Sequence, residues 1–110
     1  MANYKTFPAQ LNALKKAINQ KTEEANSNIN YKLDYVKFLV HPNLSNILIL
    51  KHRLHGISGG QPFDEIDYIF FDENGKKVDI RKSFVEVNAW YTFVSEMREA
   101  KIINGHIELI

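Results

Sequence analysis

The chain has 110 residues, of which 45% are hydrophobic and 25% charged, and this balance is typical of one globular domain with a packed core, here residues 1–110. It contains no cysteine, which excludes disulfides, thiolate metal sites and cysteine nucleophiles. The formal net charge is +1, but residues 1–60 carry an excess of Lys and Arg and residues 61–110 an excess of Asp and Glu.

The first half of the chain predicts a helix followed by strands. Apolar side chains recur on one helical face at the N-terminus, at Phe7, Leu11, Leu14, Ile18 and Ala25. From Ile29 the apolar period becomes two, and its parity switches at Tyr35-Val36, which indicates a strand with a bulge. Residues 47–50 are all apolar and predict a central strand that continues into Lys51–His55.

The middle of the chain contains two turn signals. Gly56 to Pro62 is rich in glycine and is predicted to be a loop. Residues 66–71 predict the next strand, and the Asn-Gly pair at Asn74-Gly75 predicts a tight hairpin that returns through residues 76–80. None of the serines lies in the Gly-x-Ser-x-Gly context of a hydrolase nucleophile.

Ser83 to Glu86 matches a capping box and predicts the start of a second helix. Its apolar stripe indicates broad packing across the sheet and consists of Val87, Trp90, Tyr91, Val94 and Met97. Residues 102–110 predict a closing strand or a small hairpin. We therefore predict an α+β fold, with a mostly antiparallel sheet of four or five strands, an N-terminal helix and a C-terminal helix, in the order α-β-β-β-β-α-β.

Two groups of residues are candidates for chemistry. The first is the segment Lys51, His52, Arg53 and His55, in which imidazoles stand beside cations as in a metal-independent ribonuclease. Histidines three apart on a strand point to opposite faces, so no metal site is predicted from them. The glycines of residues 56–60 lack the Gly-Lys-Ser/Thr ending of a phosphate-binding loop, and no cofactor is predicted.

The second group is acidic and includes Asp64, Glu65, Asp67 and Asp79 around the predicted hairpin. Carboxylates with a nearby lysine hold Mg²⁺ in many nucleases. The order of helix, three strands, helix and strand resembles the core of the PD-(D/E)xK nucleases, which place an acid on the second core strand and an acid-x-Lys on the third. Here residues 47–50 contain no acid, and Asp79-Ile80-Arg81 carries arginine in place of lysine.

We therefore expect a small intracellular protein-binding module, of bacterial immunity, inhibitor or adaptor type, which acts by surface complementarity and without catalysis. Its predicted partner-binding residues are Lys51, His52, Arg53, His55, Asp64, Glu65 and Asp67. The alternative is a small nuclease or ribonuclease, so nucleic acid stays open as a partner. No apolar run approaches a membrane span, and we expect a cytoplasmic protein with no membrane partner. An unpaired terminal strand would allow a homodimer.

Overall fold

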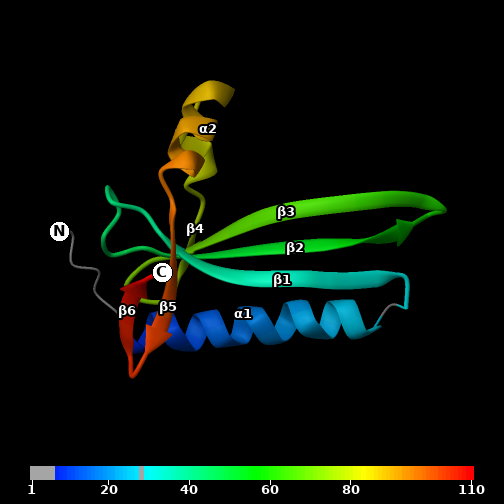
Figure 1. Ribbon diagram of the computed structural model, residues 1–110, viewed down its shortest axis with the longest axis horizontal. Helices are drawn as coiled ribbons and strands as arrows, with labels where there is room; N and C mark the ends of the chain where they lie inside the picture. The colour runs from blue at the N-terminus through cyan, green and yellow to red at the C-terminus, as the bar shows by residue number, and fades with distance from the viewer. Residues whose placement is uncertain (1–6, 28) are drawn as a thin grey trace.

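The chain folds as a six-stranded antiparallel sheet with one long helix and one short helix, and the computed structural model describes residues 7–27 and 29–110 (Figure 1). The strand order is β4-β3-β2-β1-β5-β6. The elements in chain order are α1 (Pro8–Ser27), β1 (Tyr31–Val40), β2 (Leu48–Ser58), β3 (Gln61–Phe71), β4 (Lys77–Val78), the short 3₁₀ turn η1 (Arg81–Ser83), α2 (Val87–Ser95), β5 (Arg98–Ile103) and β6 (His106–Leu109). The α+β prediction is confirmed, whereas the predicted count of four or five strands is wrong.

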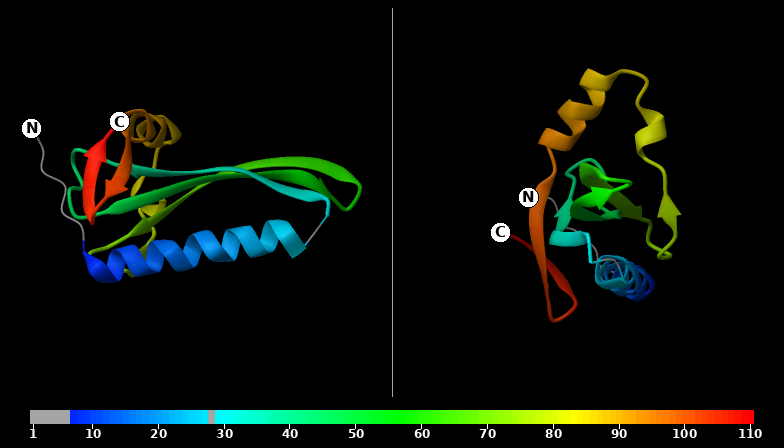
Figure 2. Two further views of the ribbon diagram at one scale, coloured as in Figure 1. Left: turned by 60° about the horizontal axis from the view of Figure 1, so that its bottom comes forward. Right: turned by 90° about the vertical axis from the view of Figure 1, so that its right-hand side faces the viewer.

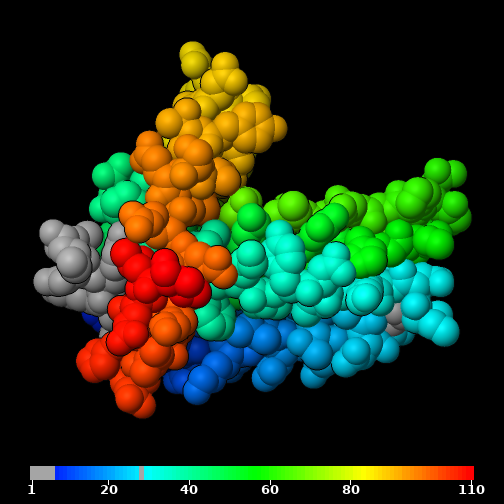
Figure 3. Space-filling view, in the orientation of Figure 1, coloured from blue at the N-terminus to red at the C-terminus, as the bar shows by residue number. Residues whose placement is uncertain are grey.

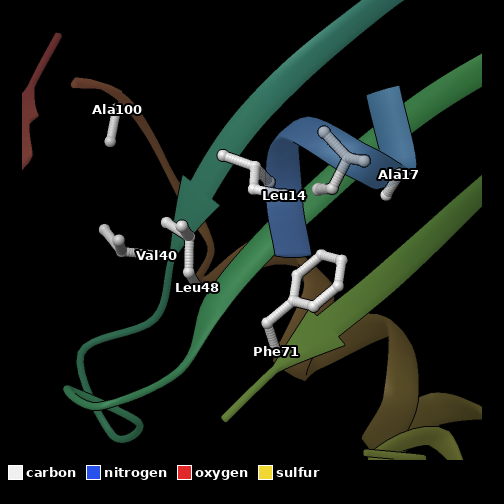
Figure 4. Close-up of a cluster of buried hydrophobic side chains, with 7 residues drawn as sticks. Leu14, Ala17, Val40, Leu48, Phe71 and Ala100 are labelled. Atoms are coloured by element: carbon white, nitrogen blue, oxygen red, sulfur yellow. The ribbon is translucent and has the colours of Figure 1, made fainter. Parts of the chain in front are cut away.

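The N-terminal helix covers one face of the sheet. Its apolar stripe buries Leu14 and Ala17 against residues of β2 and β3, among them Leu48 and Phe71 (Figure 4). The predicted amphipathic helix is therefore confirmed. Gln10 is also buried, and its side-chain amide donates to the carbonyl oxygens of Asn46 and Phe71, at 3.0 Å each. These bonds tie the start of α1 to the end of β3 and to the segment just before β2.

Strands β1, β2 and β3 form the centre of the sheet and extend well beyond β4, β5 and β6 (Figures 1 and 2). In β1 the register shifts between Leu33 and Tyr35, so that Asp34 is an extra, bulged residue. This bulge confirms the parity switch in the sequence, one residue earlier than predicted. It places Leu33 opposite Leu54 and Tyr35 opposite Arg53.

The segment from Gly56 to Pro62 is not a loop. Strand β2 continues to Ser58 and β3 begins at Gln61, with only Gly59 and Gly60 between them. Both glycines have positive φ, of 59° and 78°, as a two-residue hairpin turn requires. Three glycines within five residues suggested a loop, but Gly56 lies within β2 and only Gly59 and Gly60 form the turn. The result is a long β2-β3 hairpin that projects away from α2 (Figure 1).

The predicted Asn-Gly hairpin is confirmed between β3 and β4. The Asp72 side chain accepts from the amides of Asn74 and Lys76, at 2.9 and 2.8 Å. Gly75 has a φ of 78°, and a side chain there would collide with the carbonyl group of Ala9 on α1. The turn is therefore fixed both by its own hydrogen bonds and by close contact with the helix.

The predicted capping box does not form. The Ser83 and Phe84 amides donate to the carbonyls of Ile80 and Arg81 within η1, and α2 starts only at Val87, after Glu86. The reason lies in Phe84, whose ring packs against the rings of Trp90 and Phe93 at 5.6 and 4.9 Å. This contact keeps residue 84 extended between η1 and α2.

The predicted broad packing of the second helix is also wrong. The helix α2 has only nine residues and stands at one end of the sheet, on the side opposite α1 (Figure 2). Trp90 and Phe93 face the sheet, whereas Val87 and Tyr91 are 54% and 64% exposed. Met97 belongs to the same cluster but lies beyond the helix. The face of β1, β2 and β3 beyond α2 therefore stays uncovered.

The C-terminal residues form a hairpin, the second of the two predicted arrangements, and this hairpin supplies the additional strand. Asn104 and Gly105, with φ of 51° and 78°, make its turn, and β6 is the outer strand of the sheet next to β5. Within the described residues, neither helix is both long and apolar enough to cross a membrane.

Two glycines with the same φ provide a matched test of the β3-β4 turn. A Gly105→Ala substitution meets no atom within 4 Å and should cost only the backbone strain, about 1 kcal/mol. We expect Gly75→Ala to lower the free energy of unfolding by roughly 2 kcal/mol more, because the methyl group would collide with Ala9. Urea denaturation of both variants measures the difference. Equal losses would show that the contact with α1 does not constrain the turn.

Candidate binding surface

The strands β1, β2 and β3 have two chemically different faces. The face toward α1 is apolar and contains Leu48, Leu50 and Phe71. We call the opposite side the open face: beyond α2 it carries polar and aromatic side chains, namely Asp34, Tyr35, Lys37, Lys51, Arg53, His55, Asp64 and Tyr68. Because side chains alternate along a strand, the burial of every second residue of β2 under α1 fixes which residues point outward.

Cations and aromatic rings form a row across the open face. The Lys51 ammonium lies 5.6 Å from the ring centre of Tyr68 on β3 and 5.9 Å from that of Tyr35 on β1. The Lys37 ammonium also lies over the Tyr35 ring, 5.0 Å from its centre. These contacts hold the lysine stems against the sheet, and both lysines are half-buried.

A set of ion pairs lies next to this row, toward the tip of the hairpin. Arg53 Nε and Nη2 donate to both carboxylate oxygens of Asp64, at 2.9 and 2.5 Å. Asp34 Oδ2 lies 3.6 Å from Arg53 Nε, and its Oδ1 lies 2.7 Å from His55 Nε2. The hydrogen bonds from Arg53 lower the pKa of Asp64, and the Asp64 carboxylate raises the pKa of Arg53. Both groups therefore stay charged near neutral pH.

The helix α2 is attached to the sheet by aromatic contacts. The Trp90 ring meets Tyr68 and Phe70 edge-on, at 6.0 and 6.4 Å between centres, and Phe93 lies 6.3 Å from Phe70. His41 is fully buried and stacks on Phe93 at 4.1 Å, while its Nδ1 accepts from the Asn43 amide. These rings, together with Ile80 and Met97 of the same cluster, set the position of α2.

A groove of about 550 Å³ opens where α2, η1 and the outer edge of β3 meet. It is lined by residues 66–70 of β3, residues 77–79, Arg81 and Trp90. The Arg81 guanidinium lies 5.2 Å from the centre of the Trp90 ring and closes one side. In the space-filling view the hollow between α2 and the β2-β3 hairpin is open to solvent (Figure 3).

The structure divides the residues predicted to bind a partner. Lys51, Arg53, His55 and Asp64 lie together on the open face. His52, Glu65 and Asp67 alternate with them and belong to the side of α1, where the electrostatic influence of Lys21 and Glu24 reaches His52. The predicted binding set did not include Tyr35, Lys37, Tyr68 or Arg81. Alternation alone would have placed Tyr68 beside Lys51 once the register of β2 and β3 was known.

The groups proposed for nuclease chemistry do not converge. His52 is 3% exposed and lies on the face opposite Arg53 and His55. Asp64 is bound by Arg53, and Asp79 accepts from the Lys82 amide at 3.2 Å. Among residues 7–27 and 29–110, no three His, Asp or Glu side chains are grouped so that they could hold a metal ion.

No protein-family model matches this sequence, and neither a curated protein nor a solved structure shows significant similarity to it.

The buried His52 makes stability sensitive to acid. Neither of its ring nitrogens has a hydrogen-bond partner within the described part of the chain. Burial, and secondly Lys21, lower its pKa below 6.5, against the smaller opposing effects of Asp67, Glu24 and Glu65. The unfolded chain therefore takes up this proton first, so the contribution of neutral His52 is complete above pH 6.5 and declines as the pH falls below it.

We expect His52→Leu to reduce the loss of unfolding free energy between pH 7 and pH 5, because leucine cannot be protonated. At pH 7 the variant should lie within about 1 kcal/mol of the natural protein, since it also removes two unpaired buried nitrogens. Chemical denaturation at each pH measures both effects, and His106→Gln, at an exposed histidine, is the control. An unchanged pH dependence in His52→Leu would contradict this account of His52.

Proposed function

We propose that this chain is a protein-binding module, of immunity, inhibitor or adaptor type, which acts without catalysis and binds its partner through the open face and the adjoining groove. The observation that carries the proposal is the row of Tyr35, Lys51 and Tyr68, which leads along the uncovered sheet to Trp90. Tyr, Trp and Arg are the residues that most often dominate the energy of protein interfaces. Here they are held in place by the sheet, so their ordering costs little on binding.

The charges of this surface favour an acidic partner. Lys37, Lys51 and Arg81 form no ion pair with another residue in the described ranges, whereas Arg53 is paired with Asp64 and Asp34. The unpaired cations are therefore available to carboxylates of a partner. Complementary charge of this kind accelerates association and selects the partner.

A protein suits the open face better than a nucleic acid does. Asp34 and Asp64 lie within the face and would repel a phosphate backbone. Lysine ammonium groups lie over the rings of Tyr35 and Tyr68, which a base would need for stacking. Single-stranded nucleic acid is nevertheless a second candidate, because cations and aromatic rings alternate along one face. The two candidates make different predictions for salt dependence and for the identity of the bound molecule.

The test uses the full chain as bait in an extract of its source cells, followed by affinity measurement with the identified partner. We expect Lys37→Glu/Lys51→Glu to weaken binding at least about 10-fold, because two attractive charges become repulsive. Tyr68→Ala should weaken it comparably by removing a central aromatic contact. The matched control is Lys15→Glu/Lys16→Glu, at exposed residues of α1 remote from the open face, which should bind as the natural protein does.

A partner that binds all these variants equally well would contradict the proposed interface. Labelled single-stranded RNA and DNA are tested in parallel, with and without Mg²⁺. Strong binding that weakens steeply with salt would favour the second candidate. Cleavage would replace both binding proposals with the nuclease alternative, and loss of cleavage in His52→Ala or Asp67→Ala would identify the residue set.

A further inference from the structure

The outer edge of β3 is open because the chain leaves the sheet after two residues of β4. Lys77 and Val78 pair with Phe71 and Phe70, and then residue 80 takes a helical conformation with φ −71° and ψ −32°. Ile80 packs into the cluster under α2, and the η1 turn carries the chain away from the sheet. Among the described strands, β4 is the only neighbour of β3 on this side, so residues 61–69 pair with β2 on one side and with no strand on the other.

One backbone amide on this edge is hydrogen-bonded to a side chain of the same strand. The Tyr68 amide donates to the Oδ1 atom of its own neighbour, Asp67, at 2.9 Å. This bond occupies a group that a neighbouring strand would otherwise use. A carboxylate at the edge also discourages pairing with unrelated chains. It can move aside when a competing carbonyl arrives, because Asp67 is exposed.

The two sides of the edge differ in chemistry. Ile66 is 51% exposed and belongs with Tyr68 to the side of the open face, where Trp90 bounds the groove. Glu65 and Asp67 alternate with them and belong to the side of α1. An added strand would have the same alternation, so it would need apolar side chains toward Ile66 and basic side chains toward the two acids.

We propose that the edge of β3 between Phe63 and Ile69 binds an extended segment of a partner protein as a seventh strand, and that this segment alternates basic and apolar residues. The segment lies where β4 would continue if it did not leave at residue 79. Main-chain hydrogen bonds supply sequence-independent affinity, and the groove beside Trp90 selects the apolar side chains. Lys77, Asp79 and Arg81 also line the groove, and together they add no net negative charge. The preference for basic residues therefore arises from Glu65 and Asp67.

This site goes beyond the proposed function, because it uses the backbone of β3 and its two acids rather than the cations of the open face. The two surfaces adjoin at Tyr68 and Trp90, so one partner can occupy both. The strand site and the open face are nevertheless tested separately. The test of the open face reverses the charges of Lys37 and Lys51, whereas the test of the strand site reverses those of Glu65 and Asp67.

The experiment titrates the full protein with a short synthetic peptide of alternating lysine and valine. Trp90 is the only tryptophan, so its fluorescence reports on the groove, and amide hydrogen exchange locates the bound strand. We expect saturable fluorescence changes and new protection of amides between Phe63 and Ile69. A peptide N-methylated on the edge that faces the protein should lose this binding, because its hydrogen-bond donors are removed.

Charge specificity is tested with Glu65→Lys/Asp67→Lys, which should weaken binding of the lysine-valine peptide about 10-fold and strengthen that of a glutamate-valine peptide. Glu65→Gln/Asp67→Asn, which should give a smaller loss, repeats the test if the double reversal fails to fold. The control is Glu99→Lys/Glu108→Lys in the β5-β6 hairpin, which reverses two exposed acids remote from β3 and should bind as the natural protein does.

Three results would overturn the proposal. One is the absence of peptide binding at millimolar concentration, and another is equal binding of the N-methylated peptide. The third is protection of residues 63–69 that depends on protein concentration without any peptide, which would assign the edge to a second copy of this chain. Protection confined to β6 or the open face counts as absence of binding at this site.

Discussion

The structure depends on the burial of one face of β2 beneath α1. Leu48, Leu50 and Leu54 are buried there, and the same parity takes His52 inside although it is polar. The intervening residues, Lys51, Arg53 and His55, must then point to the other side. A slip of one residue would exchange the two sets, exposing leucines and burying three ionisable groups. Core packing thus determines the side of the sheet on which each candidate interface residue of β2 lies.

The second helix has a different role from the first. Instead of covering its face of the sheet, α2 contacts it at one end, where its Trp90 and Phe93 rings pack against Phe70. The hollow beside it exists because α2 is short and because η1 turns the chain out of the sheet. Aromatic packing and an early strand ending together create a recess next to an unpaired edge. Both proposed contact surfaces adjoin this recess, although they use different groups.

Much of the fold could be predicted from the sequence, because periodicity reports directly on burial. The stripe that includes Leu14, the bulge near Tyr35 and the Asn-Gly turn all carried unambiguous local signals. The errors arose where one pattern suits two structures. Glycines at 59 and 60 fit a loop as well as a tight turn, and Ser83 to Glu86 fits a capping box until the ring of Phe84 is drawn into the aromatic cluster. The open face required the register between strands, which no single segment specifies.

The bulge in β1 adds one residue, Asp34, to the strand. The register on either side of it differs by one residue, so a shorter chain lacking Asp34 would have a regular strand with Leu33 and Tyr35 on their present sides. Packing of the core therefore gives no reason for the extra residue. What the insertion adds is a carboxylate that reaches both Arg53 and His55. The bulge thus serves the outer surface, where the Asp34 carboxylate fixes the orientation of the Arg53 and His55 side chains.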